Sequence, residues 1–201
     1  MGRYTGPKLK KSKRVRAPIS DTTKHMKAEL EAGPGVHGAR RRGKSTIYGD
    51  RLREKQKLAF FYSIGDRQFR RYMDEATRTK TNTGQKLNEL LERRLDNVLR
   101  RGALARTIWQ ARQMVAHGHV NVNGHRVDRP SFQVKPGDVI AFRPKKKDAM
   151  KAMADTADQN SIVPTWIEVN RDEGTIKVMR LPTPDEIFRP FEANMQLVVE
   201  F

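Results

Sequence analysis

The chain has 201 residues, of which 36% are hydrophobic and 32% are charged, and its formal net charge at pH 7 is +18. This length allows one or two compact domains with real cores. Such a charge excess repels itself in an isolated protein and points to a polyanionic partner. No apolar stretch approaches the roughly 20 residues of a membrane span, and no signal peptide precedes the basic start, so nucleic acid is favoured over a membrane. The absence of cysteine excludes disulfides and thiolate metal sites and fits a cytoplasmic protein.

Residues 1–44 are predicted to form a basic arm, because they hold 13 Lys/Arg against 3 Asp/Glu, whereas 166–201 hold 4 against 7. The arm is poor in large apolar side chains and cannot bury enough surface to fold alone. A solvated tail and an arm that becomes ordered on a polyanion both fit this composition. Its candidate RNA-binding residues are the basic ones, namely Arg3, Lys8, Lys10, Lys11, Arg14, Arg40, Arg41 and Arg42.

A helical domain is predicted over 45–92. Asp66 is a candidate N-cap, and apolar side chains follow it at the i, i+3, i+4, i+7 spacing of a buried helix face. These side chains are Phe69, Tyr72, Met73 and Ala76. A further helix is expected after Thr83-Gly84, with Leu87, Leu90 and Leu91 as its apolar positions. The candidate RNA contacts in this domain are Arg51, Arg53 and Lys57.

The stretch 93–142 is predicted to contain two short helices and then a hairpin. The first helix has an apolar stripe formed by Leu91, Leu95, Val98 and Leu99. The second helix runs from Ala103 to His117 and separates an apolar face from a polar one. The apolar face holds Leu104, Ile108, Ala111 and Val115, and the polar face holds Arg106, Gln110, Gln113 and His117. Asn123-Gly124 predicts a type I′ hairpin turn, and Pro136-Gly137-Asp138 predicts a turn before a strand over 139–142.

The polar face of the second helix and the arginines around the first are the candidate RNA contacts of this stretch. Arg offers a planar fork for phosphate, and Gln can bond to sugar or base edges. The residues chosen on these grounds are Arg93, Arg94, Arg106, Arg112, Gln113 and His117. For His117, a structural histidine is an equally good interpretation.

The C-terminal third is predicted to add a small strand pair. Residues 145–160 indicate an exposed helix or helical linker, and 164–169 and 174–178 indicate two paired strands. Trp166 is expected in a core. The last seven residues, 195–201, are ambiguous between strand and helix by propensity.

Several motifs resemble the RNA-binding module named after the fourth protein of the small ribosomal subunit. In the module they are Arg94-Leu95-Asp96, Ala111-Arg112, Val122-Asn123-Gly124, Pro130-Ser131 and Gly137-Asp138. On the N-terminal side of the module, the stretches 2–10, 33–40, 48–49, 52–57 and 67–70 resemble the ribosomal protein family itself. Some members of this family carry a cysteine cluster in the arm that binds structural zinc. This chain is similar to a cysteine-free variant, in which RNA contacts would do more of the ordering.

The resemblance implies an α+β fold with an inserted module. A basic extended arm (1–44) would precede a helical domain (45–92) that is completed by a terminal helix in 185–201. The RNA-binding module, helices packed on a small antiparallel sheet, would occupy 93–184 with its core in 93–157.

The resemblance further implies a structural protein of the small ribosomal subunit in the cytoplasm. It would bind small-subunit rRNA directly and early in assembly, contact the neighbouring small-subunit protein five, and lie near the channel through which mRNA enters, where it would contribute to decoding accuracy. Neither a cofactor, a metal, a membrane nor a homo-oligomer is expected.

Two other functions are weighed against this one. A pseudouridine synthase is one alternative, because Arg94-Leu95-Asp96 resembles a catalytic motif of that class. The favoured interpretation of Asp96 is structural, as a partner of a nearby Arg or a cap on local backbone. A free RNA chaperone with the same module is the other. The long helical flanks argue against a chaperone, and the lack of a separate catalytic domain argues against the enzyme.

Overall fold

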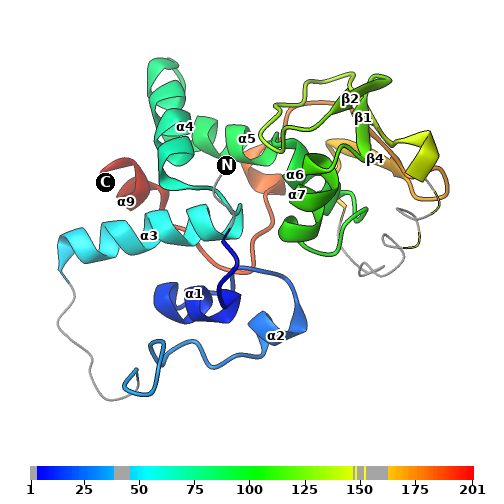
Figure 1. Cartoon of the computed structure of the whole chain (residues 1–201). Helices are drawn as coiled ribbons and strands as arrows, with labels where there is room; N and C mark the ends of the chain where they lie inside the picture. The colour runs from blue at the N-terminus through cyan, green and yellow to red at the C-terminus, as the bar shows by residue number, and fades with distance from the viewer. Residues whose placement is uncertain (1–3, 39–45, 147, 149–151, 153–162) are drawn as a thin grey trace. The chain divides into compact units, whose positions relative to one another are not determined.

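The computed structural model describes residues 4–38, 46–146, 148, 152 and 163–201 (Figure 1). The chain divides into two compact units. The first comprises Met1–Gly84 and Arg189–Phe201, and the second comprises Gln85–Phe188. The second unit is therefore inserted into the sequence of the first. The division falls within α5 (Thr83–Glu92), whereas the sequence placed the start of the module at 93.

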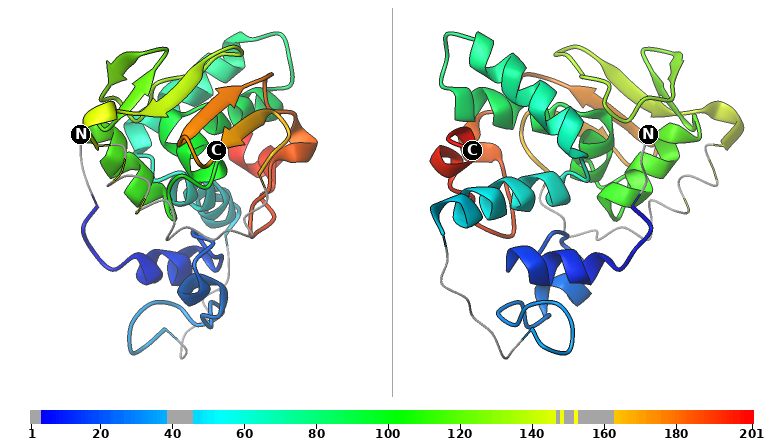
Figure 2. Two further views of the ribbon diagram at one scale, coloured as in Figure 1. Left: turned by 90° about the vertical axis from the view of Figure 1, so that its right-hand side faces the viewer. Right: turned by 60° about the vertical axis from the view of Figure 1, so that its left-hand side comes forward.

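The first unit contains three helices after the arm: α3 (Ile47–Phe61), α4 (Asp66–Arg78) and α9 (Met195–Val199). The hydroxyl of Thr46 caps α3 by accepting from the Gly49 N–H at 3.1 Å. The C-terminal segment returns to α3 (Figures 1 and 2), and Phe61 and Phe191 meet edge to face with ring centroids 5.4 Å apart. The ambiguous last residues are therefore a helix, packed as the resemblance implied.

The predicted buried face of α4 is confirmed. Phe69, Tyr72 and Ala76 are buried, and Met73 is half-buried. The prediction for Asp66 was wrong, because Gly65 is the N-cap and Asp66 is the first helical residue. The Asp66 carboxylate accepts hydrogen bonds from Lys55 Nζ and Arg70 Nε instead, and these bonds lower its pKa, with the Lys55 bond contributing most.

The arm contains two helices, α1 (Lys8–Val15) and α2 (Thr23–Met26). Val15 and Ile19 are 0% and 1% exposed, and α1 packs on α3 (Figures 1 and 2). Residues 4–38 thus contribute to the core of the first unit, which their composition did not indicate. A few apolar side chains suffice because α3 provides the opposing surface.

The second unit contains a five-stranded antiparallel sheet, in the order β2-β1-β3-β5-β4. Its strands are β1 (Val120–Val122), β2 (His125–Val127), β3 (Val139–Phe142), β4 (Ile167–Asn170) and β5 (Thr175–Val178). Two helices, α6 (Leu95–Arg101) and α7 (Ile108–Ala116), cover one face of the sheet (Figures 1 and 2). Between them lies a core that includes Leu95, Val115, Val120, Ile140 and Trp166. The expected α+β class is confirmed.

The local turn predictions are confirmed. Asn123 and Gly124 have φ values of 50° and 82°, as a type I′ turn requires, and they connect the pair Val122↔His125. The strand expected over 139–142 is β3. The predicted strand pair near the C-terminus is β4 and β5, with Trp166 1% exposed. Short 3-10 helices follow β3 at η1 (Pro144–Lys146) and β5 at η2 (Pro184–Glu186). Most of the helical linker expected over 145–160 lies outside the described residues.

Two helix predictions were wrong at their boundaries. The helix expected from Ala103 begins at Ile108, because Ala103 takes a left-handed φ of 55° and the Thr107 hydroxyl caps α7 by accepting from the Gln110 N–H. The apolar stripe over 91–99 is divided between α5 and α6. The chain is extended at Arg94, with ψ at 135°, where it forms a β-bridge with Gln133.

Candidate nucleic-acid interface

The start of α6 is fixed by a segment far along the chain. The Leu95 N–H donates to the Phe132 carbonyl and the Val134 N–H donates to the Arg93 carbonyl, both at 2.9 Å. The Asp96 N–H donates to the Pro130 carbonyl at 3.3 Å. These hydrogen bonds connect residues 93–96 to residues 130–134, in the loop before β3. The two connected segments are called the frame of the module below, because they position α6 and α7.

A buried ion pair lies inside this frame. Arg94 donates from Nε to Asp96 Oδ1 at 3.0 Å and from Nη2 to Asp96 Oδ2 at 2.6 Å. Both side chains are 0% exposed, and this bidentate geometry is the strong form of the interaction. The assignment of Arg94 to an RNA surface therefore needs correction, because its guanidinium is sealed from solvent. The ion-pair interpretation of Asp96 is confirmed, and a carboxylate so enclosed cannot reach a uridine.

A second buried cluster joins the end of α5 to α6. Arg101 donates from Nε to Glu92 Oε2 at 2.9 Å and from Nη2 to Glu92 Oε1 at 2.6 Å. The Asn97 amide also donates to Glu92 Oε2, at 2.6 Å. Arg93 is half-buried and donates to Glu89 Oε1 and to the Val134 carbonyl, both at 2.9 Å. The guanidinium groups at this junction therefore bond within the protein.

The structure turns the polar face of α7 away from the core. Ile108, Ala111, Met114 and Val115 are buried, whereas Arg106, Gln113 and His117 are exposed and Arg112 is half-buried. Gln113 and His117 are one helical turn apart, so their side chains are neighbours. The Arg106 N–H donates to Gln110 Oε1 at 2.8 Å, which fixes the backbone where α7 begins.

Sequence reasoning missed Arg126 on β2. Its guanidinium lies against Gly118, where a Cβ would stand 2.2 Å from Arg126 Nε, and Gly118 has a φ of 67°. The rings of His117 and His119 meet edge to face beside this glycine, with centroids 5.8 Å apart. Arg126 pairs with Asn121, so both side chains lie on the sheet face opposite the alternating core residues of β1.

The signal for Arg126 was present in the chain. The alternation of Val120-Asn121-Val122 defines an inner and an outer face of the strand, and the two-residue turn fixes the register of β2. Together they assign Arg126 to the outer face. The exposed groups are therefore Gln113 and His117 on the outer side of α7, and Arg126 on the outer face of the sheet, where it lies against Gly118.

The candidate cations of the helical domain all take part in ion pairs. Arg51 pairs with Glu200 at 2.7 Å, and their side chains are 35% and 39% exposed. Arg53 pairs with Asp50 at 3.0 Å, and Lys57 pairs with Glu54 at 2.5 Å. These acidic partners reduce the positive potential that an RNA would meet.

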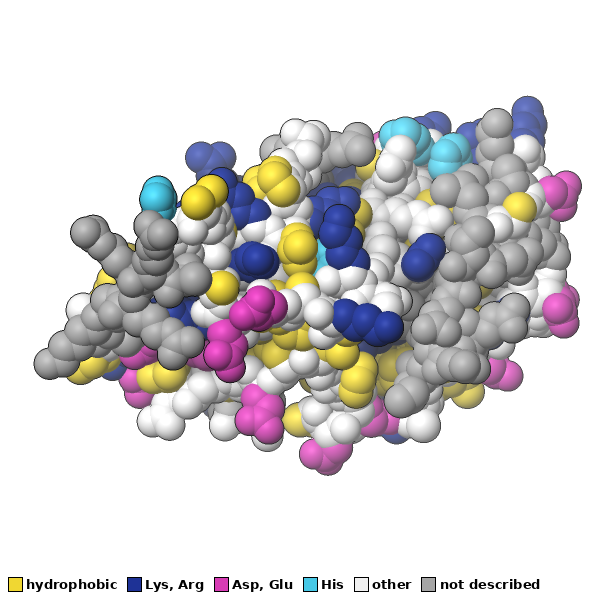
Figure 3. All heavy atoms as spheres, turned by 90° about the horizontal axis from the view of Figure 1, so that it is seen from below, with side chains coloured by type: hydrophobic (Ala, Val, Ile, Leu, Met, Phe, Trp, Pro, Cys, Tyr) yellow, Lys and Arg dark blue, Asp and Glu magenta, His cyan; other side chains and the backbone are white. Residues whose placement is uncertain are grey.

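In the arm, Lys10 and Arg14 are exposed and Lys8 is half-buried. Lys11 Nζ lies 3.6 Å from the centroid of the Tyr4 ring and 4.6 Å from that of Phe60, and burial, together with the charge of Arg14, lowers its pKa. Lys11 thus holds α1 against α3 by cation–π contact. On the side of the protein where α1 and α2 lie, Lys and Arg side chains are scattered among hydrophobic ones (Figure 3).

The remaining candidates of the arm, Arg3, Arg40, Arg41 and Arg42, lie outside the described residues.

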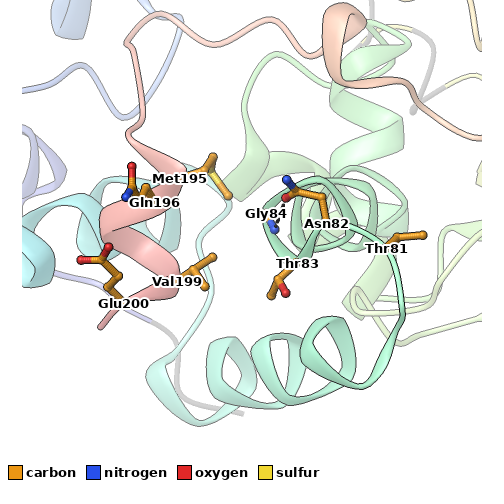
Figure 4. Close-up of a pocket in the computed structure, with 8 residues that line it drawn as sticks. All are labelled: Thr81, Asn82, Thr83, Gly84, Met195, Gln196, Val199 and Glu200. Carbon is orange, nitrogen blue, oxygen red and sulfur yellow. Dashed lines mark hydrogen bonds between the residues drawn. The ribbon is translucent and has the colours of Figure 1, made fainter.

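A hollow of about 520 Å³ lies in the first unit between the α4–α5 turn and α9 (Figure 4). Its lining consists of Thr81, Asn82, Thr83, Gly84, Met195, Gln196, Val199 and Glu200. Of these described residues Glu200 alone is ionisable at neutral pH, and it pairs with Arg51, so the hollow contains no acid–base pair. Elsewhere in the described part of the chain, no three metal-ligating side chains gather, and every helix is too short or too polar to cross a bilayer.

Comparison with known proteins gives matches over nearly the whole chain. The family model "Ribosomal protein S4/S9 N-terminal domain" matches residues 3–92, and the model "S4 domain" matches residues 93–140. The chain is 44% identical to "Small ribosomal subunit protein uS4" of Aquifex aeolicus and of Persephonella marina, and 43% identical to that of Oceanobacillus iheyensis. Each alignment covers 100% of this chain and 98% of the relative. Two family models thus match consecutive parts of the chain, the relatives that match its full length share one name, and the chain belongs to the family of small ribosomal subunit protein uS4, a family of structural proteins and not of enzymes.

Proposed function

We propose that the protein is a structural constituent of the small ribosomal subunit that binds small-subunit rRNA directly. The observation that carries this proposal is the placement of Arg106, Gln113, His117 and Arg126, which α7 and β2 turn away from the core. Arginine forks suit phosphate, and amide and imidazole groups suit sugar and base edges. Such a mixture of exposed groups suits a folded RNA that is recognised by shape and backbone.

The module and the arm have different roles in this proposal. The module provides a rigid polar face, because its arginines at the α5–α6 junction are engaged in the frame. The arm adds exposed cations on short helices, among them Lys10 and Arg14. Early binding during subunit assembly is part of this proposal, since a face that is already ordered can dock on RNA before neighbouring proteins arrive.

Co-sedimentation tests the proposal. The tagged full chain should remain with small subunits through a sucrose gradient in high salt, as an integral component does. Release of the chain into the soluble fraction, together with normal subunits in its absence, would instead support a free RNA chaperone. A variant with Arg106, Gln113 and Arg126 all changed to Ala should enter subunits less efficiently than a variant with the exposed Lys177 on β5 changed to Ala.

The finer assignments concern neighbours in the subunit. We propose contact with small-subunit protein five, a place near the channel through which mRNA enters, and a contribution to decoding accuracy, all in the cytoplasm and as a single copy rather than a homo-oligomer. The mildly acidic C-terminal part, with 4 Lys/Arg against 7 Asp/Glu over 166–201, suits a protein neighbour better than RNA.

Arg40, Arg41 and Arg42 are proposed to face the mRNA path. A moving single strand needs electrostatic guidance without tight sequence readout, and a basic triplet supplies it. Changing all three to Ala should spare assembly into small subunits and slow ribosomes at a stable mRNA hairpin. If the variant fails to enter subunits, the triplet anchors rRNA instead; if it reads structured mRNA at the normal rate, the triplet has no part in guiding mRNA.

A further inference from the structure

A buried hydrogen bond joins the two helices of the arm. Ser12 Oγ on α1 and His25 Nδ1 on α2 lie 2.7 Å apart, and the two residues are 0% and 5% exposed. The Ile19 N–H donates to the same Ser12 Oγ at 3.4 Å. One hydroxyl oxygen therefore connects α1, the segment after it and α2.

The local sequence of α2 is not enough to hold that helix. It has four residues, and its N-cap Thr22 makes no side-chain bond to the helix, whereas isolated helices shorter than about 12–15 residues are marginal in water. Tertiary contact must supply the rest, and His25 is the buried residue of α2. The bond to Ser12 is thus a polar link between α2 and the packed part of the arm.

The surroundings of His25 favour an uncharged ring. Burial lowers the pKa of His25, and the ammonium groups of Lys24 on α2 and Lys8 on α1 lower it further. A neutral ring can accept the Ser12 hydroxyl proton at Nδ1 while Ser12 Oγ accepts from Ile19. A protonated ring would have to donate at Nδ1, so the serine proton would need another acceptor and a charge would be buried beside two cations.

We propose that the Ser12–His25 pair positions the basic side chains of the arm for RNA and releases them when His25 is protonated. This inference rests on the proposed function. Exposed cations on the two helices, including Lys10, Arg14 and Lys24, keep a fixed spacing only while α1 and α2 are joined. Ser12 and His25 are buried, so they act through these cations and do not touch the RNA.

Protonation of His25 at acidic pH therefore weakens the attachment of α2 to α1. The joined state binds fewer protons than the detached state, so its stability is fully present above the ordinary His value of about 6.5 and falls as the pH drops below it. Each pH unit in that window shifts the equilibrium toward the detached arm by up to about tenfold. Electrostatics alone predicts the opposite for RNA affinity, because added protons make the protein more positive.

The test compares the full chain at about pH 7.5 and about pH 5.5, on either side of the ordinary His value. Hydrogen exchange, corrected for the intrinsic effect of pH, measures the protection of amides in α1 and α2, and filter binding measures affinity for small-subunit rRNA. In the wild type, the protection factors of these amides should be about tenfold lower at the lower pH. His25→Asn keeps a hydrogen-bonding group near the position of Nδ1 without titrating, so its protection should stay constant.

Matched controls separate the pair from general acid effects. His37→Gln changes an exposed histidine of the same arm and should behave like the wild type. Ser12→Ala should have low protection at both pH values. Should His25→Asn fail to fold, His25→Gln replaces it as the variant that does not titrate.

The RNA measurement must agree with exchange. Wild-type affinity should fall on acidification, while His25→Asn keeps or gains affinity. Equal wild-type protection at both pH values, or an equal loss in His25→Asn, overturns the inference. A wild-type chain that binds no rRNA at either pH refutes the proposed function and the RNA role of the pair, whereas the exchange data alone still decide whether His25 joins the helices.

Discussion

Replacing Asp96 by Ala should unfold the second unit under mild conditions. The change removes the carboxylate to which the Arg94 guanidinium, 0% exposed, is bonded twice, and so breaks a buried ion pair. Removal of one partner from a buried pair costs about 3–5 kcal/mol, a large part of the roughly 5–15 kcal/mol that a domain has in total. For a unit of this size, about 4–8 °C is lost per kcal/mol, so the melting temperature should fall by roughly 12–40 °C.

Tryptophan fluorescence during urea unfolding isolates this effect. The two tryptophans of the chain are Trp109 and Trp166, and both belong to the unit Gln85–Phe188, so their emission reports that unit alone. Asp128→Ala serves as the matched control, because Asp128 is exposed in the same unit and surface changes usually stay within about 0.5 kcal/mol.

A double variant shows whether the loss of stability comes from the missing ion-pair attraction or from the buried charge that remains. Arg94→Met combined with Asp96→Leu removes both charges, and buried pairs replaced by apolar residues of similar volume are often neutral or more stable. It should recover most of the stability that Asp96→Ala loses. A loss below about 1 kcal/mol in Asp96→Ala would refute the reasoning, since it would show that water or another acceptor reaches Arg94.

Three further outcomes are expected. Changing Arg106 and Arg112 together to Ala should flatten the log–log salt dependence of rRNA binding by roughly 0.7–0.9 for each phosphate that the variant no longer neutralises, and an unchanged slope would point to base-edge readout or misfolding. Deleting residues 1–44 should weaken rRNA binding and destabilise the first unit, whose core includes Val15, while the tryptophan transition persists. The pKa of Glu186 is about 2, because hydrogen bonds from Thr165, Thr183 and Arg180 outweigh the effect of burial, which raises it. The stabilisation it provides is therefore present above about pH 4.5 and lost toward pH 2, and Glu186→Gln should remove this part of the acid sensitivity in urea unfolding.

Signals confined to a few neighbouring residues predicted the fold well. Asn123-Gly124 determined both the turn and the register of β1 with β2, because only positive φ values close a two-residue hairpin with the right twist. The spacing of Phe69, Tyr72 and Ala76 identified the buried face of α4. In each case the physical cause lies within the segment itself.

Contacts between distant segments escaped prediction. The break between α5 and α6 depends on the pairing of residues 93–96 with 130–134, which no periodicity reveals. The packing of α1, which includes the buried Val15, depends on α3 as an opposing surface. Composition indicates only whether a segment has enough apolar side chains to fold alone. In this chain α3 supplies the opposing surface that the arm lacks.

In the candidate site, the sequence could not distinguish buried arginines from exposed ones. Two arginines, Arg94 and Arg101, are buried. Two others, Arg106 and Arg126, are exposed. The difference is a buried carboxylate: Asp96 and Glu92 lie within hydrogen-bond distance of the first two. An arginine two residues before an aspartate looked like part of a basic patch, whereas the fold makes it half of a neutral pair. The positive charge that a nucleic acid meets is therefore set by which cations the fold leaves exposed, and the formal charge of +18 does not reveal where they lie.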